Sequence, residues 1–155
     1  MEQIANPWKD VTHQVAVTGY VYQQGKFLLL KRAKPPLIWA PPGGRLQPHE
    51  DPKLGLLREV REETGLDVRV LGLVDYWFGE LADQGPLLSL DFLTVTPEHE
   101  VVLSPEHEDF AWATLSDLER GHPPLGKDFC SFKLTDFQKA AHECARFMYQ
   151  MPGPA

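Results

Sequence analysis

A predicted helix that carries three closely spaced glutamates is the feature that most constrains this chain. Asp51 is a favourable N-cap, Pro52 suits the first helical position, and Gly65 is typical of a helix end. Since each helical residue turns by about 100°, three acidic side chains of the segment share one arc of roughly 100°. These side chains are Glu59, Glu62 and Glu63. The segment is therefore expected to present a carboxylate face.

The opposite side of the same helix is expected to be buried. Leu54, Leu57 and Val60 lie on an opposing arc of about 120°, which suits packing. Like charges three or four residues apart cost about 0.2–0.5 kcal/mol per pair, and Arg58 and Arg61 relieve part of this. Two interpretations remain at this point. The acidic face is either solvated, or it binds a hard divalent cation, because Mg²⁺ and Mn²⁺ prefer oxygen ligands.

Strand-like segments surround this helix. Those expected to form strands are 13–22, 27–32, 67–78, 87–96 and 110–115. Residues 23–26 indicate a hairpin turn between the first two strands. The proline-rich stretch 33–44 is expected to be a loop with at most a short strand around Trp39, and Gly72 is expected to bend the third strand.

A second helix is predicted toward the C-terminus. Thr135 and Gln138 match a capping box at its start. Its expected apolar stripe consists of Phe137, Ala141, Cys144 and Met148. Strands mixed with two helices predict an α/β or α+β sandwich with helices packed on a sheet. A length of 155 residues suits a single domain spanning 1–155.

Charge and hydropathy exclude several classes of partner. A formal net charge of −7 argues against binding of long nucleic acids, which requires a basic surface. Apolar runs stay well short of the roughly 18 residues of a membrane span, and the first residues lack the features of a secretory signal. The two cysteines, Cys130 and Cys144, form no disulfide framework and fit a reducing compartment. We therefore expect a cytoplasmic protein without a membrane partner.

The segment 44–66, GRLQPHEDPKLGLLREVREETGL, decides between the two interpretations of the acidic helix. It matches the pattern G-x5-E-x7-R-E-U-x-E-E-x-G-U, where U is aliphatic. The fixed positions are Gly44, Glu50, Arg58, Glu59, Val60, Glu62, Glu63, Gly65 and Leu66. This segment resembles the Nudix box of the Nudix hydrolase family, and similar flanks extend the resemblance over about residues 13–118. The resemblance implies an α/β/α sandwich with a mixed β-sheet between helices.

The resemblance also implies a metal site. Glu59, Glu62 and Glu63 would bind one or more divalent cations, with the backbone carbonyl of Gly43 as a further ligand. The expected cofactor is Mg²⁺, with Mn²⁺ as an alternative. Glu106, six residues before Trp112, resembles a position that adds another carboxylate. The general base stays open among these four glutamates.

Other residues near the box receive supporting roles. Arg58 is expected to hold Glu59 through a charge-assisted hydrogen bond, and Glu50 is expected to tie the loop to the helix. Gly43 and Gly44 would let the backbone approach a ligand or metal closely. Arg32 and Arg45 resemble positions that contact substrate phosphates. Core packing is the default expectation for the aromatic residues, which are Trp39, Tyr76, Trp77, Phe78 and Trp112, although Trp77 must point away from its two neighbours.

The function implied is that of a Mg²⁺-dependent pyrophosphohydrolase. Its substrate would be a nucleoside diphosphate linked to another group, either a sugar nucleotide or a nucleoside triphosphate such as an oxidised deoxynucleotide. The alternative is a non-catalytic Nudix module that binds a nucleotide as a sensor; it predicts damaged carboxylates, and this box is whole. A homodimer is compatible with the family but undecided by the sequence.

Overall fold

The computed structural model describes residues 12–82, 84–128 and 130–150. The strands are β1 (Gln14–Gln23), β2 (Lys26–Arg32), β3 (Trp39–Ala40), β4 (Gly43–Arg45), β5 (Arg69–Leu81), β6 (Gly85–Val95) and β7 (His107–Ala113). The helices are α1 (Pro52–Thr64), α2 (Leu115–Glu119) and α3 (Leu134–Gln150). None of these helices is long and apolar enough, over the part of the chain described, to cross a bilayer.

The strands form one mixed sheet. Its main order is β3-β2-β1-β6-β5, while β4 pairs with β1 and β7 pairs with β2. The pairing of β1 with β6 is parallel, and the other pairings are antiparallel. The β1–β2 hairpin turns at Gln24 and Gly25, which both have positive φ as a tight hairpin turn requires.

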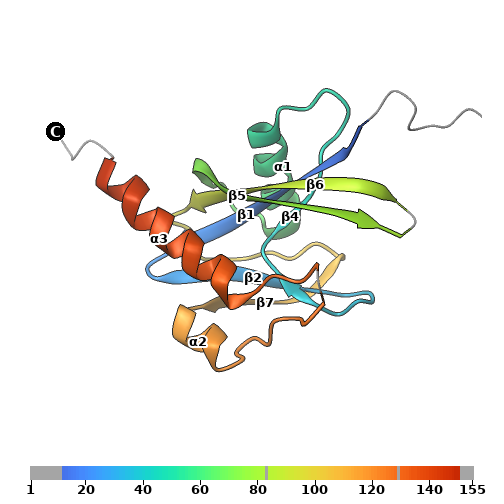
Figure 1. Cartoon of the computed structure of the whole chain (residues 1–155). Helices are drawn as coiled ribbons and strands as arrows, with labels where there is room; N and C mark the ends of the chain where they lie inside the picture. The colour runs from blue at the N-terminus through green and yellow to red at the C-terminus, as the bar shows by residue number, and fades with distance from the viewer. Residues whose placement is uncertain (1–11, 83, 129, 151–155) are drawn as a thin grey trace, which may run out of the picture.

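Helices cover both faces of this sheet (Figure 1). Because successive strand residues point to opposite faces, Val17 of β1 packs in a core cluster with Leu56 and Val60 of α1. Tyr20 of the same strand packs in the other core cluster with Phe137 of α3. The predicted α/β/α sandwich with a mixed sheet is therefore confirmed.

The ends of α1 are those predicted, and Val60 is buried as predicted, but the rest of the predicted buried face is not. Asp51 caps the helix by accepting hydrogen bonds from the backbone N–H groups of Lys53 and Leu54, and Gly65 ends it in the left-handed conformation. Leu54 is 63% exposed, so its predicted burial is wrong, and Leu57 is only half-buried. The helix is rotated because Gly55 lies against Leu46 and Glu50, where a Cβ atom would clash with the Leu46 side chain.

Two segments differ from the sequence prediction because strand pairing creates a strand in one and extends the strands of the other. The stretch predicted as loop contains β4, which pairs with β1. The β5–β6 hairpin pairs up to Leu81 and Gly85, so its loop is shorter than expected. The register of this pair shifts on either side of Gly72 and Leu73, which agrees with the predicted bend.

The helices after β7 also correct the prediction. The helix α2 was not predicted, although Thr114 and Asp117 form its capping box. In α3 the predicted capping box of Thr135 and Gln138 is wrong, because the helix begins at Leu134 and Asp136 accepts a hydrogen bond from the Lys133 N–H. Phe137 and Cys144 are buried as expected, whereas Met148 is exposed, and Phe147 packs against the core in its place.

Candidate functional site

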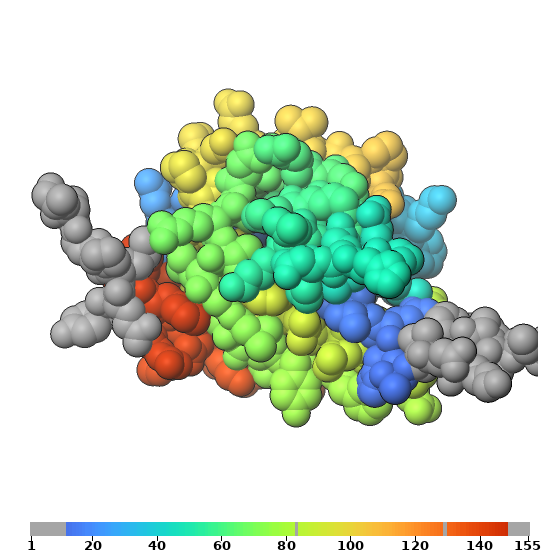
Figure 2. Space-filling view, turned by 90° about the horizontal axis from the view of Figure 1, so that it is seen from above, coloured from blue at the N-terminus to red at the C-terminus, as the bar shows by residue number. Residues whose placement is uncertain are grey.

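A cleft of about 570 Å³ opens between α1, β4 and the loop at 96–106. The residues that line it are Gly43, Gly44, Arg45, Glu59, Glu62, Glu63, Ser104, Pro105 and Glu106. We call it the carboxylate cleft. The loop is held against the end of α1, because the backbone N–H groups of Val102 and Ser104 donate to the carbonyls of Thr64 and Glu63. Figure 2 shows the face of the molecule on which α1 and this loop lie beside each other.

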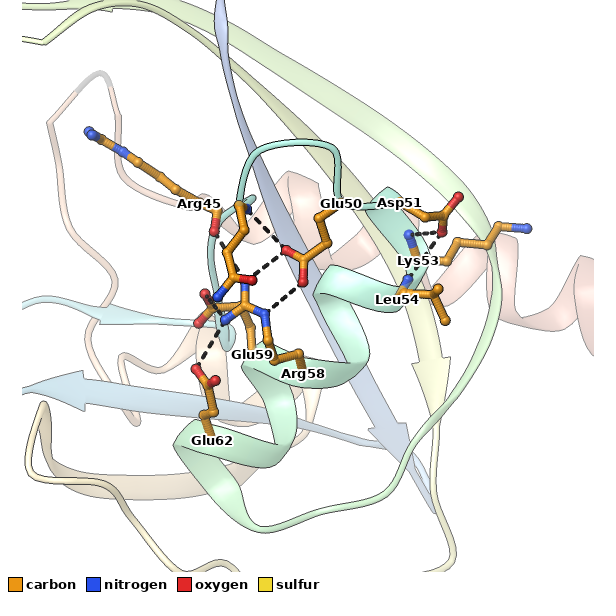
Figure 3. Close-up of polar contacts among 9 residues, drawn as sticks. Arg45, Glu50, Asp51, Lys53, Leu54, Arg58, Glu59 and Glu62 are labelled. Carbon is orange, nitrogen blue, oxygen red and sulfur yellow. Dashed lines mark hydrogen bonds and ion pairs between the residues drawn. The ribbon is translucent and has the colours of Figure 1, made fainter.

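One arginine organises the carboxylates along α1 (Figure 3). Arg58 Nε and Nη2 donate to the two oxygens of Glu50 at 2.8 and 2.9 Å. Arg58 Nη1 donates to Glu59 Oε1 and to Glu62 Oε2, both at 3.1 Å. The bonds from Arg58 and from the Gln47 N–H lower the pKa of Glu50 to about 2. The expected contact between Arg58 and Glu59 is present, and Glu50 ties the preceding loop to the helix.

Glu63 is the buried member of the glutamate group. It is 3% exposed, and its Oε2 lies 3.6 Å from His107 Nε2. Burial raises the pKa of Glu63 above its ordinary value, and the neighbouring Glu59 and Glu106 raise it further, although the backbone N–H of Gly43 opposes this effect. A buried carboxyl among other carboxylates must either keep a proton or face a cation.

The donors of the carboxylate cleft fit a hard divalent cation. Glu59, Glu62, Glu63 and Glu106 all offer oxygen ligands, which Mg²⁺ and Mn²⁺ prefer. Ser104 Oγ, which also lines the cleft, is buried and has no hydrogen-bond partner among the described residues. Within the described residues, no three acidic, histidine or cysteine side chains are already gathered tightly enough to hold a metal. Binding would therefore draw the side chains together, and Glu62, whose side chain is exposed and bonded to Arg58, would have to turn toward the cation.

The two glycines before α1 are required by close packing. A Cβ atom at Gly43 would clash with the carbonyl oxygen of Val17 on β1. At Gly44 it would lie 2.6 Å from the carboxyl carbon of Glu59. Gly44 thus allows the Glu59 carboxylate to lie directly over β4, where its position depends on a backbone without a side chain.

The structure separates the two arginines predicted to contact phosphates. Arg45 lines the carboxylate cleft, and its exposed side chain extends away from the glutamates (Figure 3). Arg32 does not line this cleft but a second cavity, of about 470 Å³, on the other face of the sheet. Gly43 and Gly44 line both spaces, so the two join at these glycines.

This second space, which we call the α3 cavity, contains residues that the sequence analysis did not select. Asp91 of β6 is 5% exposed and lines it together with Ser89 and Trp77. The available signal for Asp91 was that it is the one acidic residue of a mainly apolar strand, β6. Trp77 points away from Tyr76 and Phe78 as predicted, but both neighbours are exposed, so core packing is the wrong description of these two.

Comparison with known proteins agrees with this geometry. The sequence model of the NUDIX domain matches residues 12–131. This chain belongs to the Nudix family. The predicted family and enzyme class, a Nudix hydrolase acting on phosphoanhydride bonds, are therefore confirmed.

Proteins similar to this Nudix chain carry the names of several different Nudix proteins. The chain is 33% identical over 97 residues to an asymmetrical bis(5′-nucleosyl)-tetraphosphatase of Mus musculus, a match that spans 59% of this chain and 66% of that protein. It is 28% identical over 125 residues to an ADP-ribose pyrophosphatase of Methanocaldococcus jannaschii, covering 77% and 74% of the two chains. A MutT protein of Methanosarcina mazei Go1 has a similar structure, with a TM-score of 0.70, 25% identity and coverage of 85% and 95%.

Proposed function

We propose that this Nudix chain is a Mg²⁺-dependent pyrophosphohydrolase that cleaves a nucleoside diphosphate linked to another group. The observation that carries the proposal is the carboxylate cleft itself. It brings Glu59, Glu62 and Glu63 of α1 together with Glu106 of a loop far along the chain. So many carboxylates around one cleft suit a substrate phosphate only when a cation lies between them.

The residues of the cleft would have different roles in such a reaction. Glu59, Glu62, Glu63 and Glu106 would hold the divalent cation, which supplies polarisation of the phosphorus and acidification of a water molecule. Arg58 keeps Glu59 and Glu62 oriented through its hydrogen bonds. Burial raises the pKa of Glu63 in the protein without metal, and a cation beside Glu63 would stabilise its charged form. Arg45 at the rim is placed to contact a phosphate.

The identity of the group linked to the nucleotide stays open between sugar nucleotides and nucleoside triphosphates, including oxidised ones. The relatives named as a bis(5′-nucleosyl)-tetraphosphatase and an ADP-ribose pyrophosphatase support a nucleotide substrate in general. A cytoplasmic location, the use of Mn²⁺ and a homodimer remain predictions.

A substrate screen tests the proposal. Sugar nucleotides, dinucleoside polyphosphates and nucleoside triphosphates are each incubated with Mg²⁺ or Mn²⁺, with the wild type beside Glu62→Gln. We expect hydrolysis by the wild type and a loss on the order of 10²-fold or more in the variant, because a ligand of the cation is removed. Glu119→Gln, an exposed glutamate of α2, is the matched control and should keep its activity.

Two outcomes of this screen would change the conclusion. Full activity of Glu62→Gln refutes the metal site. A wild type that binds nucleotides but hydrolyses none favours the sensor alternative. Hydrolysis in water labelled with oxygen-18 then identifies the phosphorus that is attacked.

A further inference from the structure

The imidazole ring of His107, the first residue of β7, lies beside the buried glutamate of α1. His107 Nε2 is 3.6 Å from Glu63 Oε2. This distance is longer than a hydrogen bond, but a small shift of either side chain would form one. The side chains of His107 and Glu63 are only 13% and 4% exposed, so water competes little for a bond between them.

Glu63 differs from the other two glutamates of α1 in the groups that orient it. The hydrogen bonds of Arg58 hold Glu59 and Glu62. Glu63 instead has the backbone N–H of Gly43 on one side and the imidazole ring on the other. Carboxylates that bind a metal are usually oriented by hydrogen bonds from surrounding groups. The imidazole is therefore in the place where such a group is needed.

The two ring nitrogens of His107 have different surroundings. Nδ1 is buried and has no hydrogen-bond partner among the described residues, whereas Nε2 faces Glu63. With a cation in the cleft, Glu63 is charged and its oxygens can only accept hydrogen bonds. A ring protonated only at Nδ1 would bury an N–H group without an acceptor and would turn a lone pair toward a carboxylate, and both are unfavourable. The proton is therefore expected on Nε2, in the neutral and in the charged ring alike.

The backbone around His107 is fixed against both α1 and β2. The His107 N–H donates to the Ser104 carbonyl at 3.2 Å, and the Ser104 N–H donates to the Glu63 carbonyl at 3.3 Å. The carbonyl of Glu106, the preceding residue, accepts the N–H of Ala33 at 2.9 Å. The ring is thus attached to a segment that is held against the glutamates, as a group that orients a ligand must be.

We propose that His107 is a positioning residue of the carboxylate cleft, which donates a hydrogen bond from Nε2 to Glu63 and keeps this carboxylate turned toward the cation. This role rests on the proposed function, because it concerns Glu63 as a ligand of the cation. Arg58 would orient Glu59 and Glu62, and His107 would orient Glu63. Each of the three helix carboxylates would then be held by a side-chain donor.

Nitrogen-15 NMR of the histidine side chains detects the protonated ring nitrogen directly and does not need catalysis. Spectra of the full chain are recorded with and without Mg²⁺. The signals of His107, among those of the six histidines, are identified by their absence in His107→Gln. With Mg²⁺ we expect a proton on His107 Nε2. A ring protonated only at Nδ1 would overturn the proposal, even if the enzyme hydrolyses nucleotides.

Two amide variants test whether the position of the donor matters. The side-chain nitrogen of glutamine is as many bonds from Cα as histidine Nε2, whereas that of asparagine corresponds to Nδ1. His107→Gln should bind Mg²⁺ within about threefold of the wild type, and His107→Asn about 10–100-fold more weakly, the usual cost of losing a group that orients a ligand. Isothermal titration calorimetry measures the affinities. His99→Gln, at an exposed position of the loop at 96–106, is the matched control and should bind like the wild type.

The outcomes separate this inference from the proposed function. Equal affinity of the wild type and His107→Asn refutes the role of His107 and leaves the metal site intact. Thermal unfolding without metal measures the packing of the ring. Similar losses of stability and of Mg²⁺ affinity in both amide variants would show that the ring only packs, which overturns the proposal. A wild type that binds neither Mg²⁺ nor Mn²⁺ refutes the metal site and the role of His107 together. If His107→Asn does not fold, the NMR experiment on the wild type decides.

Discussion

Two groups of three carboxyl side chains lie on opposite faces of the same sheet, and their surroundings differ. On the α1 face, Glu59 and Glu62 are held by Arg58, and Glu63 lies behind them. On the α3 face, Asp91 lies at the bottom of a cavity among hydroxyl groups, near Asp75 and Asp136.

The comparison shows that the groups around a carboxyl side chain, more than the choice of Asp or Glu, determine which ligand it suits. An arginine that donates hydrogen bonds to several carboxylates keeps them oriented, which suits a cation. Burial beside hydroxyl groups moves a carboxyl group toward its neutral form, which suits hydrogen bonding to an uncharged ligand. The first arrangement fits chemistry on phosphates, and the second fits recognition.

The largest expected effect concerns Glu63 on the α1 face. Glu63→Gln should lower kcat/KM on the order of 10³-fold or more, because several kcal/mol of metal-derived stabilisation of the transition state is lost. The protein without metal should be no less stable, since burial already favours the neutral form of Glu63 and a neutral glutamine can keep the hydrogen bond from Gly43. Thermal unfolding with and without Mg²⁺ measures the effect. Equal stabilisation of variant and wild type by Mg²⁺ would contradict a metal role for Glu63.

The second-largest expected effect is on the pH dependence of stability and concerns Asp91 on the α3 face. Its folded-state pKa of about 7 lies above the unfolded value of about 3.9, so the native state binds this proton more tightly. The stability linked to Asp91 is therefore complete below about pH 4 and is lost as the pH rises through about 7. Between about pH 5 and about pH 8 the wild type should lose roughly 2–3 kcal/mol of unfolding free energy relative to Asp91→Asn.

Urea unfolding at the two pH values measures this difference. Asp109→Asn, an exposed aspartate of β7, is the control and should follow the wild type. Parallel pH profiles for the wild type and Asp91→Asn would show that Asp91 is charged in the native state at acidic pH. The proposed difference between the glutamates on the α1 face and Asp91 on the α3 face would then be wrong.

The third-largest effect tests whether Arg58 keeps Glu59 and Glu62 oriented. Arg58→Ala should weaken Mg²⁺ binding by about 10–100-fold, the usual cost of losing a residue that orients ligands. Arg58→Lys should not restore binding, because lysine cannot form the paired bonds to Glu50 while it also reaches Glu59. Isothermal titration calorimetry measures the affinity. Arg61→Ala, at an exposed position of the same helix, is the control, and a similar loss there would show that the effect is only one of net charge.

The smallest expected effect compares the starts of the two helices. Asp51→Ala should cost about 1 kcal/mol of unfolding free energy, because Asp51 accepts two backbone N–H groups of α1. Thr135→Ala should cost less than about 0.5 kcal/mol, because Asp136 and not Thr135 accepts the N–H group at the start of α3. Chemical denaturation of both variants measures the difference, and equal costs would return Thr135 to a capping role.

The sequence alone determined the features that depend on neighbours along the chain. The ends of α1 follow from Asp51, Pro52 and Gly65, and the family follows from the spacing of the box. The spacing of four residues on α1 also brings Arg58 to Glu62, whereas Arg58 and Glu59 are adjacent, so helix geometry alone does not place those two side chains together.

Only the tertiary structure decided what is buried and what meets across the sheet. Glu63 is buried because α1 is rotated by its packing at Gly55 and because the loop at 96–106 covers it. Asp91 lies beside Thr18 because β1 and β6 pair in parallel, which no local pattern specifies, whereas Ser89 lies two residues before Asp91 on the same strand. Burial and long-range pairing are properties of the assembled layers, so a carboxyl group acquires its charge state and its partners only when distant segments come together.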